Sequence, residues 1–169
     1  MDREFLIESP VVLKGAGDIT VCYRDGKREF IPIEERVLPF ENAVLNTGRA
    51  AFVRGIANQY GGVFNSWVYQ MAFGSGGTVG GVPRYVDAGR TGLWGPVVAV
   101  KTVMATINPN LPSQVTFTSV LLFDDAVGST INEMGLILKS GEYYSITTFG
   151  DIYKTSAVQL LVNWRQFYL

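Results

Sequence analysis

The side chains of this sequence that could do chemistry are carboxylates, one thiol and a few amines, because the chain contains no histidine. Histidine is the usual general base near neutral pH and the most common metal ligand. Without it, serine–histidine–aspartate and cysteine–histidine arrangements are impossible. The single cysteine, Cys22, leaves no zinc site of ordinary type. We therefore expect no enzyme activity, and no catalytic, metal-binding or cofactor-binding residue.

The carboxylates remain as candidates for acid–base chemistry. Two pairs are adjacent in the sequence, Asp124-Asp125 and Glu34-Glu35. Neighbouring residues on a strand point to opposite faces, so neither pair is expected to converge on one substrate. Lys154 would be a candidate catalytic amine if it were buried, but the favoured interpretation is that it pairs with a carboxylate such as Glu133.

A glycine-rich segment begins at Gly74-Ser75-Gly76-Gly77 and reaches Gly95-Pro96. It lacks the Gly-Lys-Ser/Thr step and the following helix that a phosphate-binding loop requires. A loop that needs positive φ angles or a close approach of backbones explains these glycines better. Loops of this length inside a domain are often functional or are ordered by a partner.

Composition excludes several functional classes. Net charge is −1 and no basic block occurs, so the chain has no electrostatic footprint for nucleic acid. No apolar run reaches the ~20 residues of a membrane helix. Charged residues are only 17% and aromatic residues 12% of the chain. This combination indicates either a large β core or a surface that other protein covers.

The pattern of apolar residues predicts a mainly β protein. We predict an antiparallel β-sandwich of about eight strands, with one short helix and an extended N-terminal arm. The expected organisation is an arm and hairpin over residues 1–40, followed by a sandwich domain over 41–169 with a helix near 47–60. Residues 1–13 form the predicted arm, and Asp25-Gly26 is a type I′ turn signal.

Before the predicted sandwich, residues 34–40 are expected to be a connector that ends at Pro39. The expected strands cover residues 64–73, 97–106, 115–123, 131–138, 143–149 and 158–169. In the last of them, alternation places Val158, Leu160, Val162 and Trp164 on one face and Gln159, Asn163 and Arg165 on the other.

Short motifs follow one another in the second part of the chain. They are Asn46-Thr47-Gly48-Arg49, Met71-Ala72-Phe73-Gly74-Ser75-Gly76-Gly77, Ile131-Asn132-Glu133-Met134-Gly135-Leu136, Phe149, Ile152, Lys154-Thr155, Val162-Asn163-Trp164 and Phe167. This spaced pattern resembles virion proteins of tailed bacteriophages, in particular tail-fibre attachment and collar domains that end in Asn-Glu-x-Gly-Leu, Lys-Thr and Trp motifs. The resemblance covers residues 46–169, whereas residues 1–40 match no family.

The resemblance implies a non-enzymatic building block of the phage virion, made in the cytoplasm of the bacterial host. Its expected partners are copies of itself and other virion proteins, with no nucleic acid and no membrane. Glu133 would pair with Lys154 to fix a strand against a loop, and Trp164 would anchor the core or a subunit contact. The expected structural or interface residues are Asn132, Glu133, Gly135, Lys154, Trp164, Gly74, Gly76, Gly77, Trp67 and Trp94.

Three functions stay open at this stage. The resemblance favours a ring or fibre-attachment protein of the tail, neck or baseplate, which assembles as a symmetric oligomer. A decoration or cement protein of the head is the alternative. A carbohydrate-binding module is the third, because Trp67, Tyr85 and Trp94 are rings that can stack on sugars.

Overall fold

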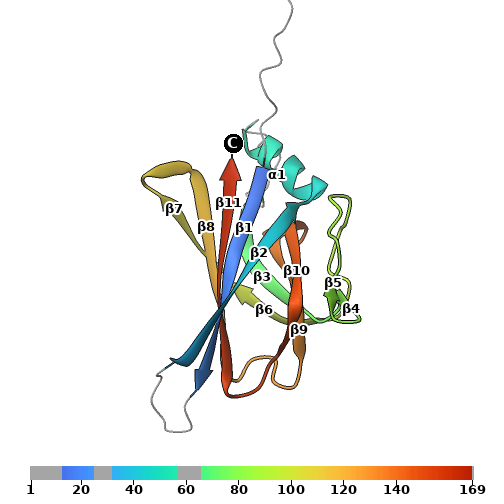
Figure 1. Cartoon of the computed structure of the whole chain (residues 1–169). Coiled ribbons are helices and arrows are strands. Elements are labelled where there is room, and N and C mark those ends of the chain that lie inside the picture. The colour runs from blue at the N-terminus through green and yellow to red at the C-terminus, as the bar shows by residue number, and fades with distance from the viewer. Residues whose placement is uncertain (1–12, 25–31, 57–65, 169) are drawn as a thin grey trace, which may run out of the picture.

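A computed structural model describes residues 13–24, 32–56 and 66–168 of the protein (Figure 1). Residues 1–12 of the predicted arm, the Asp25-Gly26 turn and the predicted helix residues 57–60 lie outside this described part. The mainly β class with one short helix is confirmed. The elements are β1 (Leu13–Arg24), β2 (Pro32–Val44), α1 (Asn46–Ile56), β3 (Val68–Gly74), β4 (Thr78–Val79), β5 (Val82–Pro83), β6 (Val97–Thr102), β7 (Met104–Asn108), β8 (Leu111–Leu121), β9 (Thr130–Leu138), β10 (Tyr143–Tyr153) and β11 (Val158–Tyr168).

Nine of these strands form one antiparallel sheet, in the order β6-β3-β9-β10-β2-β1-β11-β8-β7. The sheet folds over on itself and nearly closes into a barrel, so its two halves face each other as the layers of a sandwich do. Figure 1 shows α1 at the end of the barrel where β11 finishes, and the small β4–β5 hairpin beside β10. The described part of the chain therefore resembles a sandwich whose halves are joined at one side by a shared strand.

The shared strand is β2. Its first part pairs with β1, from Pro32 to Asn42, whereas Ala43 and Val44 pair with β10. The prediction of a connector over residues 34–40 is therefore wrong. Pro39 lies opposite Asp18 of β1 and pairs with no other strand of the described structure. Proline is tolerated in a strand where its missing N–H would face an open edge.

The opposite corner of the fold is the stretch that contains β6 and β7. β6 pairs with β3, and β7 pairs with β8. Val103 lies between the two strands, and its N–H donates to the carbonyl of Tyr69, at 3.2 Å. The predicted single strand over residues 97–106 therefore turns from one half of the sheet to the other.

The core lies between the two halves of the sheet. In β11, Val158, Leu160, Val162 and Trp164 are buried, and the intervening residues are half-buried on the outside, as the alternation predicts. Trp164 is 0% exposed and packs edge-on against Phe40, with ring centroids 5.1 Å apart. Trp164 is thus a core anchor.

The helix α1 packs against β10 through a small residue. A Cβ atom on Gly48 would lie 2.3 Å from the carbonyl oxygen of Tyr144, so only glycine permits this approach. The Thr47 hydroxyl donates to the carbonyl of Tyr143. The motif Asn46-Thr47-Gly48 therefore seats the first turn of the helix on the sheet.

The predicted domain boundary at residue 40 falls inside β2. β1 and β2 are central strands of the nine-stranded sheet. The hairpin and the remaining strands therefore share one sheet.

Candidate functional site

The glycine-rich segment between β3 and β6 is the most organised irregular part of the described structure. It leaves β3 at Gly74, which pairs with Glu133 of β9. Met134 and Leu136 of β9 belong to the hydrophobic core. Since neighbouring residues of a strand point to opposite faces, Glu133 lies on the outer face of β9, under the glycine-rich loop.

The carboxylate of Glu133 holds both ends of that loop. Its Oε1 accepts hydrogen bonds from the backbone N–H groups of Gly76 and Gly95, and its Oε2 accepts one from Trp94, each at 2.8 Å. The residue is 0% exposed. A buried carboxylate is costly unless it is hydrogen-bonded, and bonds to a charged acceptor are stronger than neutral ones. Glu133 is thus an anchor for the loop.

The predicted pair between Glu133 and Lys154 is wrong. The three ion pairs of the described residues are Arg54–Glu142, Lys101–Asp125 and Arg165–Asp18. The hydrogen-bond partners of the Glu133 carboxylate are backbone N–H groups. No sequence motif predicts such partners, because any residue except proline supplies a backbone donor.

Asn132 holds the same loop beside Glu133. Its Oδ1 accepts the N–H of Gly77 at 2.7 Å, and its Nδ2 donates to the Thr78 hydroxyl and to Asp151 of β10. The Thr78 hydroxyl also donates to Asp151, at 2.9 Å. The Asn132-Glu133 step therefore fixes the loop start to β9 and β10.

The loop backbones cross at two glycines. A Cβ atom on Gly76 would lie 2.1 Å from the nitrogen of Gly95, and a Cβ atom on Gly95 would lie 2.4 Å from the nitrogen of Gly76. A Cβ atom on Gly77 would lie 2.2 Å from the carbonyl oxygen of Asn132. The close backbone approach expected for this segment is confirmed, and it brings both N–H groups to one carboxylate oxygen.

Arginine side chains close the loop from its outer side. The Arg90 guanidinium lies 3.5 Å from the centroid of the Trp94 ring, and Arg84 lies 5.9 Å from it. Arg84 Nε also donates to the carbonyl of Gly76, and Arg90 donates to the carbonyls of Gly92 and Leu93. Cation–π contacts and hydrogen bonds thus hold Trp94 in place. Sequence reasoning singled out Trp94 but neither arginine.

Lys154 organises a different turn, at the opposite end of β10 from α1. Its side chain is 0% exposed, and its Nζ donates to the carbonyls of Phe123 and Thr155, at 2.7 and 3.2 Å. Burial lowers the pKa of this amine, while the charges of Asp125 and Asp124 oppose that shift. With two of its donors bound to carbonyls, Lys154 is a structural amine.

Asp125 shows the complementary effect in the same turn. Burial alone would raise the pKa of its carboxyl group. A hydrogen bond and ion pair from Lys101 at 2.6 Å, the N–H of Leu122 and the charge of Lys154 together hold that pKa below its usual value. Of the expected turn acids Asp124-Asp125, Asp125 therefore holds the turn, through Lys101 and the N–H of Leu122.

The remaining candidate residues have structural roles. Gly135 lies under the ring of Tyr143, where a Cβ atom would come within 2.5 Å of the ring. Burial and then the charge of Glu133 raise the pKa of the Tyr143 hydroxyl.

Trp67 lies just before β3, is 50% exposed and packs edge-on against Tyr69. Its predicted place on a strand over residues 64–73 is wrong, since β3 begins at Val68.

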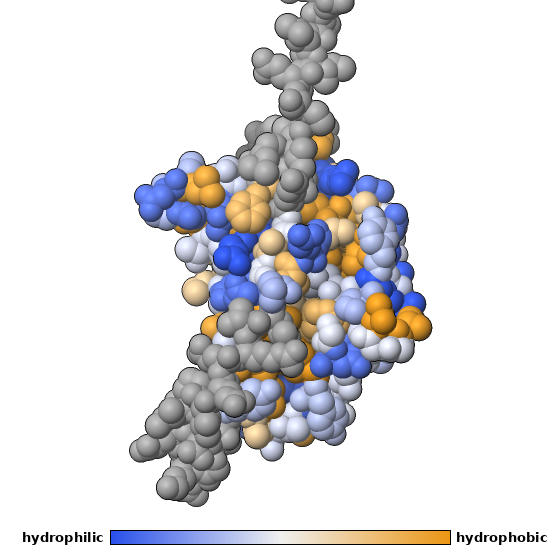
Figure 2. Space-filling view, viewed as in Figure 1, coloured by the Kyte–Doolittle hydropathy of each residue, from blue (hydrophilic) through white to orange (hydrophobic). Residues whose placement is uncertain are grey.

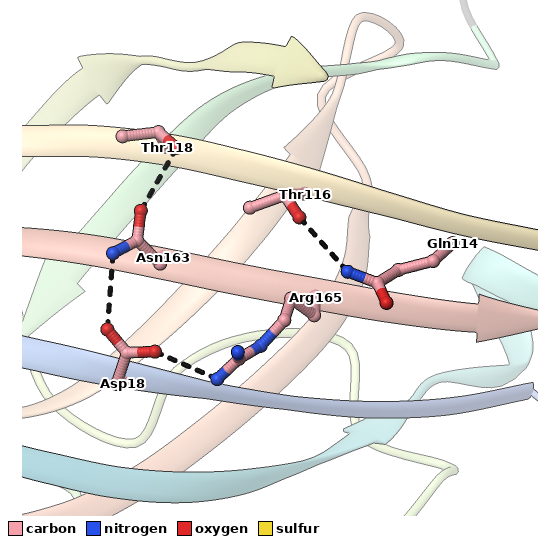
Figure 3. Close-up of polar contacts among 6 residues, drawn as sticks. All are labelled: Asp18, Gln114, Thr116, Thr118, Asn163 and Arg165. Carbon is pink, nitrogen blue, oxygen red and sulfur yellow. Dashed lines mark hydrogen bonds and ion pairs between the residues drawn. The ribbon is translucent and has the colours of Figure 1, made fainter. Parts of the chain in front are cut away.

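A polar network lies on the outer face of β1, β11 and β8 (Figure 3). Asp18 binds Arg165 at 2.8 Å and accepts a hydrogen bond from Asn163, which in turn accepts one from Thr118. Alternation in the sequence predicts that Asn163 and Arg165 face outward. It does not predict which strands lie beside them. These partly exposed groups bind one another and cover the sheet.

Among the described residues, no group of three or more aspartate, glutamate or cysteine side chains could hold a metal ion. Among those residues no helix has the length and apolar character needed to cross a bilayer. No protein-family model matches the chain, and no curated protein and no solved structure is significantly similar to it.

Proposed function

We propose that this protein is a non-enzymatic structural component of a tailed-phage particle and works as a symmetric oligomer. The favoured place is a ring or fibre-attachment position of the tail, neck or baseplate. The observation that carries the assembly role is a rigidly anchored loop that presents apolar side chains to solvent. The phage assignment itself depends on the motif pattern of residues 46–169.

The anchored loop has an apolar outer end. Val79, Val82 and Tyr85 are 58%, 67% and 87% exposed. Figure 2 shows hydrophobic residues at the edge of the molecule where the β4–β5 hairpin lies. Exposed apolar groups that are held in place, rather than scattered on mobile chain, are typical of protein–protein contacts. The fixed loop also lowers the entropy cost of binding, because little of it has to be ordered.

A second apolar region occurs on the β7–β8 hairpin. Met104 and Ile107 of β7 are each 66% exposed, and Leu111 at the start of β8 is 43% exposed. β7 is also the last strand of the sheet, so its outer edge has no neighbouring strand in the described structure. Two separate apolar regions on one protomer are what a closed ring requires, since each subunit contacts two neighbours.

The buried polar residues support a structural role. Glu133, Asn132 and Lys154 direct their polar atoms into hydrogen bonds with loops and turns. A catalytic acid or amine would instead face a cleft that a substrate can enter. These side chains therefore stabilise the fold in a protein whose function is contact with other protein.

A carbohydrate-binding module is the weaker alternative. Arg90 covers one face of the Trp94 ring, and of the three candidate rings Tyr85 and Trp67 are the exposed ones. We therefore retain the glycan hypothesis only for a glycan array to test.

The proposal is tested with the double variant Val82→Ser/Tyr85→Ser. We expect light scattering to show an oligomer of defined mass for the wild-type protein. We expect a smaller particle mass for the variant, with an unchanged melting temperature. Val127→Ser, at a position 53% exposed on another turn, is the matched control and should leave the oligomer unchanged. Mixing with purified tails and with assembled heads then separates the tail position from the head-decoration alternative.

A further inference from the structure

The seam between β2 and β10 is paired by backbone only at its α1 end. Val44 pairs with Ser145 and Ala43 with Ile146. Beyond this point the Thr147 hydroxyl donates to the carbonyl of Glu41, at 2.7 Å. From Thr148 onward, the described residues of β10 make no ladder pair with β2.

The edge that β2 presents along this seam carries backbone polar groups. The hydroxyls of Ser145 and Thr147 bond to the carbonyls of Ala43 and Glu41, so alternate residues of β2 direct their carbonyls toward β10. By the same alternation the carbonyl of Pro39 points into the seam. Pro39 supplies no N–H, and the carbonyl of Glu41 already accepts from Thr147, so this stretch offers an added strand the Pro39 carbonyl as an acceptor.

A groove of about 630 Å³ occupies the open part of the seam. Residues 39–41 of β2 form one wall and residues 148–151 of β10 form the other, with Pro83 of the β4–β5 hairpin at the side. Phe40 and Phe149 lie at its base, each 6% exposed. The groove therefore combines an open backbone edge with two aromatic side chains below it.

The β10 wall is itself irregular. The pairing of β10 with β9 skips from Thr148 to Ile152, so residues 149–151 bulge away from β9. The Thr148 hydroxyl donates to the carbonyl of Arg84 at 2.6 Å, which holds the glycine-rich loop against this wall. The glycine-rich loop thus borders the groove on this side.

We propose that this groove binds residues 4–8 of a neighbouring copy of the same chain as an added strand. This proposal rests on the proposed oligomeric function and specifies one contact between its subunits. Residues 1–12 precede β1, and Phe5-Leu6-Ile7 within them is an apolar run. Extended, such a segment spans up to ~40 Å, which suffices to reach a neighbour. Strand addition supplies affinity through backbone bonds and specificity through the aromatic base.

The register of the sheet favours a neighbour over the chain's own arm. Gly15 lies opposite Asn42, so the start of β1 is level with Ala43 and Val44, where the seam is closed by pairing with β10. The chain's own arm would have to pass over these paired residues to enter the groove. A segment from another copy need not cross them.

Cross-linking of full-length chains tests this contact. Two variants are made in a Cys22→Ser background, one with Leu6→Cys and one with Glu41→Cys, and one of them carries a tag so that a mixed dimer has its own size. The control replaces Glu41→Cys by Val100→Cys, on β6, which lies three strands from β10 in the sheet and is also exposed. Each pair is mixed, allowed to exchange subunits, and oxidised.

We expect a mixed disulfide dimer with Glu41→Cys and little or none with Val100→Cys. Equal yields from the two pairs, in a protein that is still oligomeric by light scattering, would reject the groove contact and leave the proposed function standing. A cross-link only within single chains that carry both Leu6→Cys and Glu41→Cys would also overturn it, because the arm would then bind its own groove. A protein that is monomeric throughout would overturn the proposed function and this contact together.

Discussion

Gly76 and Gly95 pass so close to each other that a Cβ atom on Gly76 would lie 2.1 Å from the nitrogen of Gly95. Their two N–H groups point at one oxygen of Glu133, each 2.8 Å away. The beginning and the end of the glycine-rich loop are thus held at one point on β9. This crossing makes an otherwise irregular segment into a fixed part of the protein surface.

The crossing predicts that Gly76→Ala destabilises the protein. The added methyl group meets backbone, which cannot rotate away, so we expect a loss of about 1–3 kcal/mol in the free energy of unfolding. Urea denaturation measures this loss. Gly92→Ala is the matched control in the same loop, because its Cβ atom would meet only the Tyr143 ring, at an ordinary 3.9 Å. Equal stabilities for the two variants would contradict the crossing.

The anchor predicts that Glu133→Gln is strongly destabilising. An amide keeps the shape of the carboxylate but replaces one acceptor oxygen by an NH₂ group that faces an N–H donor. We expect a cost of about 2–4 kcal/mol, since a buried charged acceptor is lost and a donor is left unpaired. Hydrogen exchange should also become faster at the N–H groups of Gly76, Trp94 and Gly95.

Glu142→Gln is the control for that substitution. Glu142 forms an ion pair with Arg54 in which both side chains are more than two-fifths exposed. Such exposed pairs contribute little, so we expect a change within about 0.5 kcal/mol and no effect on loop exchange. If Glu133→Gln behaved like Glu142→Gln, the carboxylate would not be the anchor of the loop.

The buried amine of Lys154 predicts a pH dependence of stability. Because burial lowers its pKa in the folded state, the unfolded chain binds this proton more readily at pH values below the ordinary lysine value of 10.5. Stability should therefore rise with pH between the lowered pKa and 10.5. Comparing wild type with Lys154→Met across this range isolates the contribution, since titration of Tyr143 is common to both. A difference between the two proteins that does not vary with pH would contradict the lowered pKa.

Substitutions at the adjacent residues Trp164 and Arg165 should have very different effects on the free energy of unfolding. Trp164 fills the core against Phe40, so Trp164→Ala should cost about 3–5 kcal/mol. Arg165 forms a partly exposed ion pair with Asp18 on the outer face, so Arg165→Ala should cost at most about 1 kcal/mol. Thermal denaturation of both variants measures the contrast. A severe loss in Arg165→Ala would mean that the outer face contributes more than its exposure allows.

Local patterns in the sequence predicted the elements whose hydrophobic period is regular. The alternation from Val158 to Trp164 and the hairpin around Ser140-Gly141-Glu142 are confirmed. β2 continues past the predicted end of its strand near Pro32, because Pro39 and two adjacent acids, Glu34-Glu35, interrupt the apolar pattern. Its place between β1 and β10 is decided by pairing with distant strands, which overrides local preference.

The sequence predicts which residues matter around the glycine-rich loop, but not the hydrogen bonds that they make. Glu133, Asn132 and the glycines Gly76 and Gly77 were all singled out, yet Glu133 was paired with Lys154. Matching charges is the simplest assumption from sequence, but here backbone N–H groups satisfy the carboxylate. Backbone donors are the same at nearly every residue, so only the folded path of the loop reveals them.

Native mass spectrometry of the full-length wild-type protein tests the central claim most directly, because that claim is assembly through a fixed surface. We predict one closed oligomer of defined stoichiometry that persists on dilution and dissociates in Val82→Ser/Tyr85→Ser. A protein that remains a monomer at every accessible concentration, with Val82 and Tyr85 intact, would contradict the account.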